Sequence, residues 1–243
     1  ICNLNEHSED FESHLEQILS DPNSGILLLA TEMGEEDVKV FHRAVAPLVV
    51  LDASFEQMDF DTVLINNTDS VSNAVGHLIK MGHREIGYLK SSMRIQNFRY
   101  REAGYRRAHE EAEIAVNPAF TVELTPTMEG AYKDMARFLE RNPQLPTAYF
   151  ADNDIIALGA MKALKEAGCR IPEDISIIGF DDLPFCEISS PPLSTIRVFK
   201  QEMGQMAVKR LLDKIKSQSK IVSKIQIGTE YIERESVKAL PQI

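Results

Sequence analysis

The chain has 243 residues, of which 44% are hydrophobic and 26% are charged. These proportions are ordinary for a globular protein, and no apolar run approaches the ~20 residues that a transmembrane helix needs. The formal net charge of −11 argues against a nucleic-acid-binding surface on this chain, because such a surface needs clustered Lys and Arg.

The first part of the chain alternates between short apolar runs and helical apolar stripes. In chain order, these patterns predict a strand tail at 1–3, a helix over 8–19, a strand over 25–30, a helix over 38–45 and a strand over 48–51. Asp52 follows directly on the last of these strands. Alternation of this kind is typical of a parallel sheet whose strands are connected by helices.

The alternation continues through the rest of the chain. The predicted elements are strand 63–65, helix 71–81, strand 86–89, helix 100–112, strand 120–122, helix 129–140, strand 148–151, helix 155–167, strand 175–180, extended segment 194–199, helix 203–215 and a half-exposed strand 225–233. A sheet of this many strands in one layer is less expected than two α/β lobes joined by several crossing segments.

Polar side chains follow two neighbouring predicted strands. Asp152 and Asn153 come after the strand over 148–151, and Asp181 and Asp182 come after the strand over 175–180. Both strands are apolar on both faces, so the unit is interpreted as a right-handed parallel crossover, whose carboxyl edge is where ligands bind. A binding site is therefore predicted there, with the alternative that Asp152 or Asp154 only caps the following helix.

The common motifs of catalysis are missing from the sequence. There is no Gly-rich phosphate loop, no H-E-x-x-H and no G-x-S-x-G, and the six histidines are scattered. The acidic residues of the predicted edge could in principle hold a divalent cation, but no Lys or Thr nucleophile accompanies them. No metal, no cofactor and no enzymatic activity are therefore expected. The three cysteines, Cys2, Cys169 and Cys186, have no metal-ligand spacing and fit reduced thiols in a cytoplasm.

Several motifs occur in the order typical of one protein family. They are Asn66-Asn67 before a helix, G-H-R-E-I at 82–86, R-x-x-G-Y at 101–105, A-D-N-D-I-I-A-L-G-A-M-K-A-L-K-E-A-G at 151–168, I-P-E-D-I-S-I-I-G-F-D-D at 171–182, P-P-L-S-T-I-R at 191–197 and E-R-E-S at 233–236. Together they resemble the effector-binding core of lactose-repressor/galactose-repressor (LacI/GalR) transcription factors over essentially the whole chain.

The resemblance implies an α/β fold with two lobes of the periplasmic-binding-protein type, each a parallel sheet flanked by helices. The expected lobes are 1–66 with 200–222 (N-terminal) and 67–199 with 223–243 (C-terminal), with a ligand in the cleft between them. The first strand and helix of the N-terminal lobe are expected to be missing from this chain.

Four positions match the family's ligand contacts and are expected to bind a sugar. They are Asp52, Arg101, Asn153 and Asp181, which combine fixed donors with acceptors, as adjacent sugar hydroxyls require. An aromatic ring is expected against the apolar face of the sugar, with Phe150 as the chosen candidate and Phe180 and Phe185 as others; core packing is the alternative for all three. At Val198 some family members carry a glutamine, so the ligand cannot be copied from one relative.

The resemblance also implies the role of the chain. It is expected to be the effector-binding and dimerisation core of a bacterial transcriptional regulator, cytoplasmic, homodimeric and without a membrane partner. Operator DNA would be bound only through a helix-turn-helix headpiece that this chain does not contain. Helices 8–19 and 71–81 are candidates for the dimer contact. The alternative function is a sugar-binding protein of a transport system, which shares the lobes and the cleft.

Overall fold

The computed structural model describes Glu16, Ser20 and residues 25–44, 46–55, 58–217 and 220–241, with the backbone alone at 42–43. The predicted strand tail at 1–3 and, apart from Glu16, the helix over 8–19 lie outside these residues. The chain divides into two compact units. The first comprises Ile1–Ile65 and Phe199–Ile227, and the second comprises Asn66–Val198 and Gly228–Ile243.

The first unit contains a parallel sheet that carries helices. The strands lie in the order β1 (Ile26–Leu29), β2 (Leu48–Leu51), β3 (Asp61–Ile65), β9 (Lys224–Ile227). The helical segments are α2 (Glu35–Lys39), the 3₁₀ turn η1 (Val40–Arg43) and α8 (Lys200–Ser217). Helix α8 packs on β1, β2 and β3. Alternate residues of β1, Ile26 and Leu28, join Val38 and Phe41 in a buried cluster, as expected for a strand with one face on a core.

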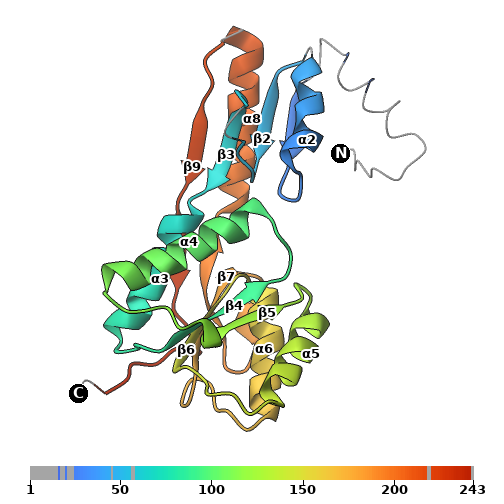
Figure 1. The fold of residues 1–243 in the computed structure, drawn as a ribbon. Helices are drawn as coiled ribbons and strands as arrows, with labels where there is room; N and C mark the ends of the chain where they lie inside the picture. The colour runs from blue at the N-terminus through green and yellow to red at the C-terminus, as the bar shows by residue number, and fades with distance from the viewer. Residues whose placement is uncertain are drawn as a thin grey trace. The chain divides into compact units, whose positions relative to one another are not determined.

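The second unit contains the larger sheet (Figure 1). Its strands lie in the order β10 (Thr229–Ile232), β8 (Ser194–Val198), β7 (Ser176–Asp181), β6 (Ala148–Ala151), β4 (Ile86–Ser91), β5 (Thr121–Leu124). All neighbouring pairs are parallel except β10 with β8. The carboxyl ends of β4, β6 and β7 therefore meet at one edge of the sheet.

Four long helices of the second unit pack in two pairs. The pairs are α3 (Asn67–Lys80) with α4 (Gln96–Glu111) and α5 (Met128–Leu139) with α6 (Asp154–Glu166), and a short helix, α7 (Phe185–Ile188), follows β7. A glycine lies in the contact of each pair, because a Cβ on Gly104 would come within 2.4 Å of Thr68 O and one on Gly159 within 2.6 Å of Met128 O. The backbones therefore approach more closely than any side chain allows.

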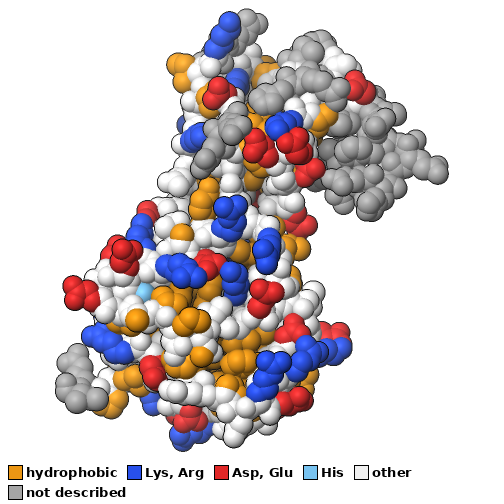
Figure 2. All heavy atoms as spheres, in the orientation of Figure 1, with side chains coloured by type: hydrophobic (Ala, Val, Ile, Leu, Met, Phe, Trp, Pro, Cys, Tyr) orange, Lys and Arg blue, Asp and Glu red, His pale blue; other side chains and the backbone are white. Residues whose placement is uncertain are grey.

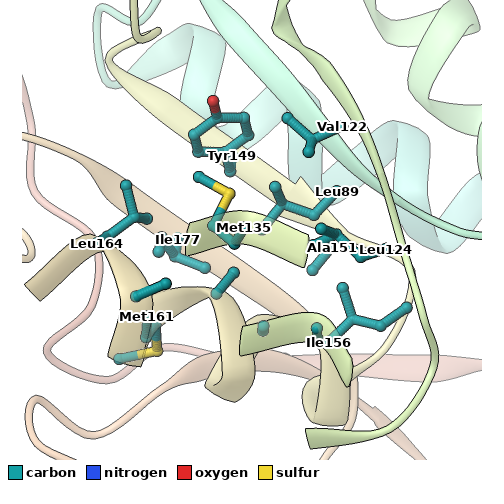
Figure 3. Close-up of a cluster of buried hydrophobic side chains, with 14 of the residues drawn as sticks. Leu89, Val122, Leu124, Met135, Tyr149, Ala151, Ile156, Met161, Leu164 and Ile177 are labelled. Atoms are coloured by element: carbon teal, nitrogen blue, oxygen red, sulfur yellow. The ribbon is translucent and has the colours of Figure 1, made fainter. Parts of the chain in front are cut away.

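The α5–α6 pair closes the main apolar core of the second unit. Figure 3 shows Tyr149, Met135, Leu89 and Ile177 converging between the sheet and these helices, and all four are fully buried. Burial of apolar area of this kind is the principal term that stabilises an α/β layer. The position of the sheet edge, and of the side chains on it, depends on this core.

The α/β class and the parallel sheets flanked by helices are confirmed, and most predicted elements fall within a few residues of the observed ones. One prediction, the single strand over 225–233, is wrong. Gly228 separates two strands there, of which β9 pairs with β3 in the first unit and β10 pairs with β8 in the second. Residues 223–227 consequently belong to the first unit, whereas they had been predicted in the C-terminal lobe.

None of the described helices is both long enough and apolar enough to cross a bilayer.

Candidate functional site

The carboxyl edge of the second sheet gathers polar side chains from four elements. Strand β4 ends at Ser91, β6 is followed by Asp152, and β7 ends at Asp181. Helix α4, which follows β4, brings Arg101 to the same edge, where it contacts both Asp152 and Asp181. Residues far apart in the sequence are thus brought together, as a parallel sheet requires.

Arg101 is the centre of this cluster and is only 4% exposed. Its Nε donates to Asn67 Oδ1 at 2.9 Å, its Nη1 donates to the main-chain oxygen of Asp152, and its Nη2 lies 3.5 Å from Asp181 Oδ1. The guanidinium carbon lies 3.6 Å from the centre of the Phe180 ring, a cation–π distance. The planar fork is therefore fixed on three sides, and the end that faces Asp181 is held least tightly.

Asp152 lies beneath Arg101 and is fully buried. Its carboxylate accepts hydrogen bonds from Tyr88 Oη and from the main-chain N–H of Ser91, the latter at 2.6 Å. Burial raises the pKa of the Asp152 carboxyl to about 6, although both hydrogen bonds and the charge of Arg101 favour the ionised form.

The helix cap is Asn153, and not Asp152 or Asp154. Asn153 Oδ1 accepts the main-chain N–H of Ile156 at 2.9 Å at the start of α6. Asp154 points into the unit, where it accepts hydrogen bonds from Thr195 Oγ1 at 2.5 Å and from Leu183 N at 2.8 Å. The cap leaves the amide nitrogen of Asn153 as the part of its side chain that can donate to a ligand.

Asp181 and Asp182 both have positive φ angles, 109° and 49°. Such angles are unfavourable for residues with a Cβ and often mark functional turns. Asp182 pairs with Arg197 at 2.7 Å and with Arg234 at 2.8 Å. Burial alone would raise the pKa of Asp182, but the hydrogen bonds from the two arginines outweigh it and lower the pKa. Asp182 therefore ties the β7 end to β8 and to the C-terminal segment.

The prediction for Phe150 is wrong. Its ring is fully buried and lies parallel to the Tyr88 ring, with centroids 5.8 Å apart, so it presents no face to a ligand. A strand residue points to one face of the sheet or the other according to its parity, and Phe150 points into the aromatic layer under α4. Phe180 is also fully buried and supports Arg101, whereas Phe185 is 52% exposed in α7.

Asp52 belongs to the first unit, whereas Arg101, Asn153 and Asp181 belong to the second. It follows β2 with φ of 62°, and its Oδ2 accepts a hydrogen bond from Thr31 Oγ1 at 2.7 Å. The position after a strand end is as expected. Its participation in ligand binding together with the other three residues stays a prediction.

Asn67 and Asn97 are two site residues that sequence reasoning did not assign. Both are nearly fully buried, and Asn67 Nδ2 donates to Asn97 Oδ1 at 3.0 Å while Asn67 Oδ1 holds Arg101. The available signal was an Asn pair directly before an amphipathic helix. The structure shows that the second member of the pair is the first residue of α3 and supports Arg101.

The described residues contain no cluster of three or more His, Cys, Asp or Glu side chains that could hold a metal ion. The carboxylates of Asp154 and Asp182 accept hydrogen bonds from protein groups, Leu183 N and Arg197 Nε respectively. Figure 2 shows Lys and Arg side chains intermixed with Asp and Glu over the described residues of the visible face. Such mixing does not match the basic stripe of a nucleic-acid-binding surface.

Replacing Asp154 by Asn is expected to reduce the dependence of stability on pH between about pH 5 and 7. Burial raises the pKa of Asp154 from 3.8 to about 6, so the folded state retains its proton over a range in which the unfolded chain has lost it. The favourable contribution is complete below pH 3.8 and is lost as pH rises through about 6, by roughly 1 kcal/mol between pH 5 and 7. Urea unfolding of both proteins at the two pH values measures the difference, and parallel profiles would contradict the expectation.

Comparison with known proteins identifies close relatives in sequence. Residues 75–237 match the family described as a periplasmic binding protein-like domain. The chain is 35% identical over 244 residues to the HTH-type transcriptional repressor PurR of Haemophilus influenzae (strain PittEE), with 99% of this chain and 72% of that protein covered. It is 37% identical over 194 residues to the ribose operon repressor of Haemophilus influenzae (strain ATCC 51907 / DSM 11121 / KW20 / Rd), covering 80% of this chain and 58% of that protein.

Solved structures with the same fold contain small molecules. The chain is similar to the transcriptional regulator CelR in complex with cellobiose, with a TM-score of 0.83, 25% identity and coverage of 93% of this chain and 69% of that one. It is similar to a LacI family transcriptional regulator from Enterococcus faecalis V583 with bound ribose, with a TM-score of 0.82, 27% identity and coverage of 99% and 87%.

Proposed function

We infer the function from the family to which the chain belongs: it is the effector-binding core of a LacI/GalR-family transcriptional regulator. Its relatives are named as repressors, which favours this function over a sugar-binding protein of a transport system. Those relatives are not named as enzymes, and no catalytic motif points to a reaction.

The proposed effector is a sugar or sugar derivative, bound at the carboxyl edge of the second sheet. The observation that carries the proposal is the fixed guanidinium of Arg101, whose Nη2 end faces Asp181 across 3.5 Å. A ligand hydroxyl placed there meets a charged donor and a charged acceptor, and the Asn153 amide adds a second donor. The cellobiose and ribose in similar structures support this class of ligand.

Regulation follows if the effector binds one conformation of the protein better than another. Such coupling amounts to ~1–3 kcal/mol and acts reciprocally between effector and operator DNA. We place the contact with DNA outside this chain for two reasons. The chain has a net charge of −11, and it covers 72% of the length of a relative that is named an HTH-type repressor. Assembly as a homodimer is part of the same proposal.

Removing Arg101 is expected to lower effector affinity about 10- to 100-fold, which is the usual cost of charge-assisted hydrogen bonds (~1.5–3 kcal/mol). Isothermal titration calorimetry with ribose, cellobiose and their phosphates first identifies the best ligand for the wild type. Arg101→Ala is then compared with it. Arg101→Lys retains the charge but cannot reproduce the fork, so a similar loss is expected.

Arg106→Ala is the matched control on the same helix. Arg106 is exposed and pairs with Glu102 at 2.7 Å, so its removal is expected to leave affinity unchanged and stability nearly so. Circular dichroism shows whether the Arg101→Ala variant is folded. A folded Arg101→Ala variant that binds the effector with wild-type affinity would refute the proposed site.

A further inference from the structure

Asp152 is bound to β4 through every polar group it has except one. Its carboxylate accepts from Tyr88 Oη and Ser91 N, and its own main-chain N–H donates to Leu89 O at 3.0 Å. The exception is the main-chain oxygen, which accepts from Arg101 Nη1. The residue that holds one arm of the guanidinium is therefore itself held by β4 at three points.

Tyr88 extends this connection back to α4. Its ring stacks on Tyr105 with centroids 4.9 Å apart and an interplanar angle of 13°, and Tyr105 Oη donates to Ile86 O at 2.7 Å. Tyr105 is one helical turn after Arg101 on α4. The contacts thus form a closed loop, from Arg101 to Asp152, from Asp152 to Tyr88, from Tyr88 to Tyr105 and back along α4 to Arg101.

A carboxylate at this buried position has a specific consequence for Arg101. A neutral acceptor at this position would have a lower desolvation cost. A carboxylate accepts two donors at once and also supplies negative charge behind a guanidinium that is itself 4% exposed. Both properties favour one fixed orientation of the guanidinium before any ligand arrives, and pre-orientation of a binding group reduces the entropy lost on binding.

We propose that Asp152 is a positioning residue of the effector site: its carboxylate fixes the main-chain oxygen that orients Arg101, without touching the effector. This proposal rests on the proposed function for the role of Arg101 in binding. The orientation of Arg101 can nevertheless be measured in the absence of any ligand, so the two proposals can fail separately.

The test combines two measurements on the full chain. The side-chain Nε–H signal of Arg101 in a ¹H–¹⁵N spectrum, assigned by its loss in Arg101→Lys, reports the orientation of the guanidinium. Calorimetry with the sugar that binds the wild type best reports affinity. In Asp152→Ala the Arg101 signal is expected to shift or broaden and affinity to fall at least tenfold. In Asp152→Asn, whose amide can still accept from Ser91 N but carries no negative charge behind Arg101, a smaller shift of the Arg101 signal and a smaller loss of affinity than in Asp152→Ala are expected.

Ser236→Ala is the control for loss of stability alone. Ser236 is fully buried in the same unit and also makes two strong hydrogen bonds, accepting from Ser194 N at 2.8 Å and donating to Ile177 O at 2.6 Å. It is expected to lower stability and to leave both the Arg101 signal and affinity unchanged.

A folded Asp152→Ala protein whose Arg101 signal and affinity match the wild type would overturn the proposal. If that variant does not fold, Tyr88→Phe removes one of the two carboxylate bonds and decides instead: a shifted Arg101 signal supports the proposal, and an unchanged signal overturns it. If no sugar binds the wild type, the proposed function fails, while the Arg101 signal still decides the role of Asp152.

Discussion

The variant Gly104→Ala is expected to unfold at a clearly lower urea concentration than the wild type and to bind effector more weakly. A Cβ at this position would lie 2.4 Å from Thr68 O, 2.9 Å from Val71 Cβ and 3.1 Å from Ser72 N. Two of these neighbours are backbone atoms, so α4 would have to move away from α3. Overpacking of this kind costs about 3 kcal/mol. Because Arg101 is less than one turn before Gly104 on α4, the same movement displaces its guanidinium.

Two glycine variants separate the parts of this expectation. Gly159→Ala introduces a similar clash in the α5–α6 contact, 2.6 Å from Met128 O and 2.7 Å from Ala131 Cβ. It is expected to lower stability with a smaller loss of affinity, because Asn153 caps α6 more than one turn before Gly159. Gly76→Ala meets no atom within 4 Å on α3 and is expected to raise stability by about 0.5–1 kcal/mol. Wild-type stability and affinity in Gly104→Ala would show that the α3–α4 contact is not as close as described.

Replacing Asp61 by Ala is expected to destabilise the first unit by about 3–5 kcal/mol. Asp61 is fully buried at the start of β3 and accepts hydrogen bonds from Arg210 Nε at 2.6 Å, from Lys214 and from Ser223 N at 2.8 Å. Its loss leaves two mostly buried cations of α8 without this carboxylate and removes one of the hydrogen bonds that hold the segment leading into β9. Urea unfolding at neutral pH, followed by circular dichroism, measures the change.

The pH dependence of stability gives a second check on Asp61. Burial would raise its pKa, but the hydrogen bonds from Lys214 and Arg210 outweigh burial and lower it. The contribution of Asp61 is therefore present above its ordinary pKa and is lost as pH falls below that value. Glu36→Ala is the control, because Glu36 pairs with Lys39 on the exposed side of α2, and such pairs contribute little. A change of under about 1 kcal/mol in Asp61→Ala would contradict the expectation.

Local sequence pattern was sufficient to predict the strand–helix alternation and the parallel sheets. The run A-Y-F-A at 148–151 matches β6 residue for residue, and the stripe of α6 begins within one residue of the observed start. Periodicity records which face of an element is buried, and burial is the dominant energy term, so it can be seen in any short window. The family was likewise predicted from motif order.

What each polar side chain does was decided only by the fold. Asp152, Asn153 and Asp154 are consecutive and chemically alike, yet one supports Arg101, one caps α6 and one holds Thr195 and Leu183. Phe150 was the chosen candidate for a ligand face and Phe180 was another, and both lie in the interior. Asn153 has a local partner, Ile156, but the partners of Asp152 and Asp154 are tens of positions away in the chain. Such distances exist only once the strands are ordered in the sheet, and no local pattern contains that order.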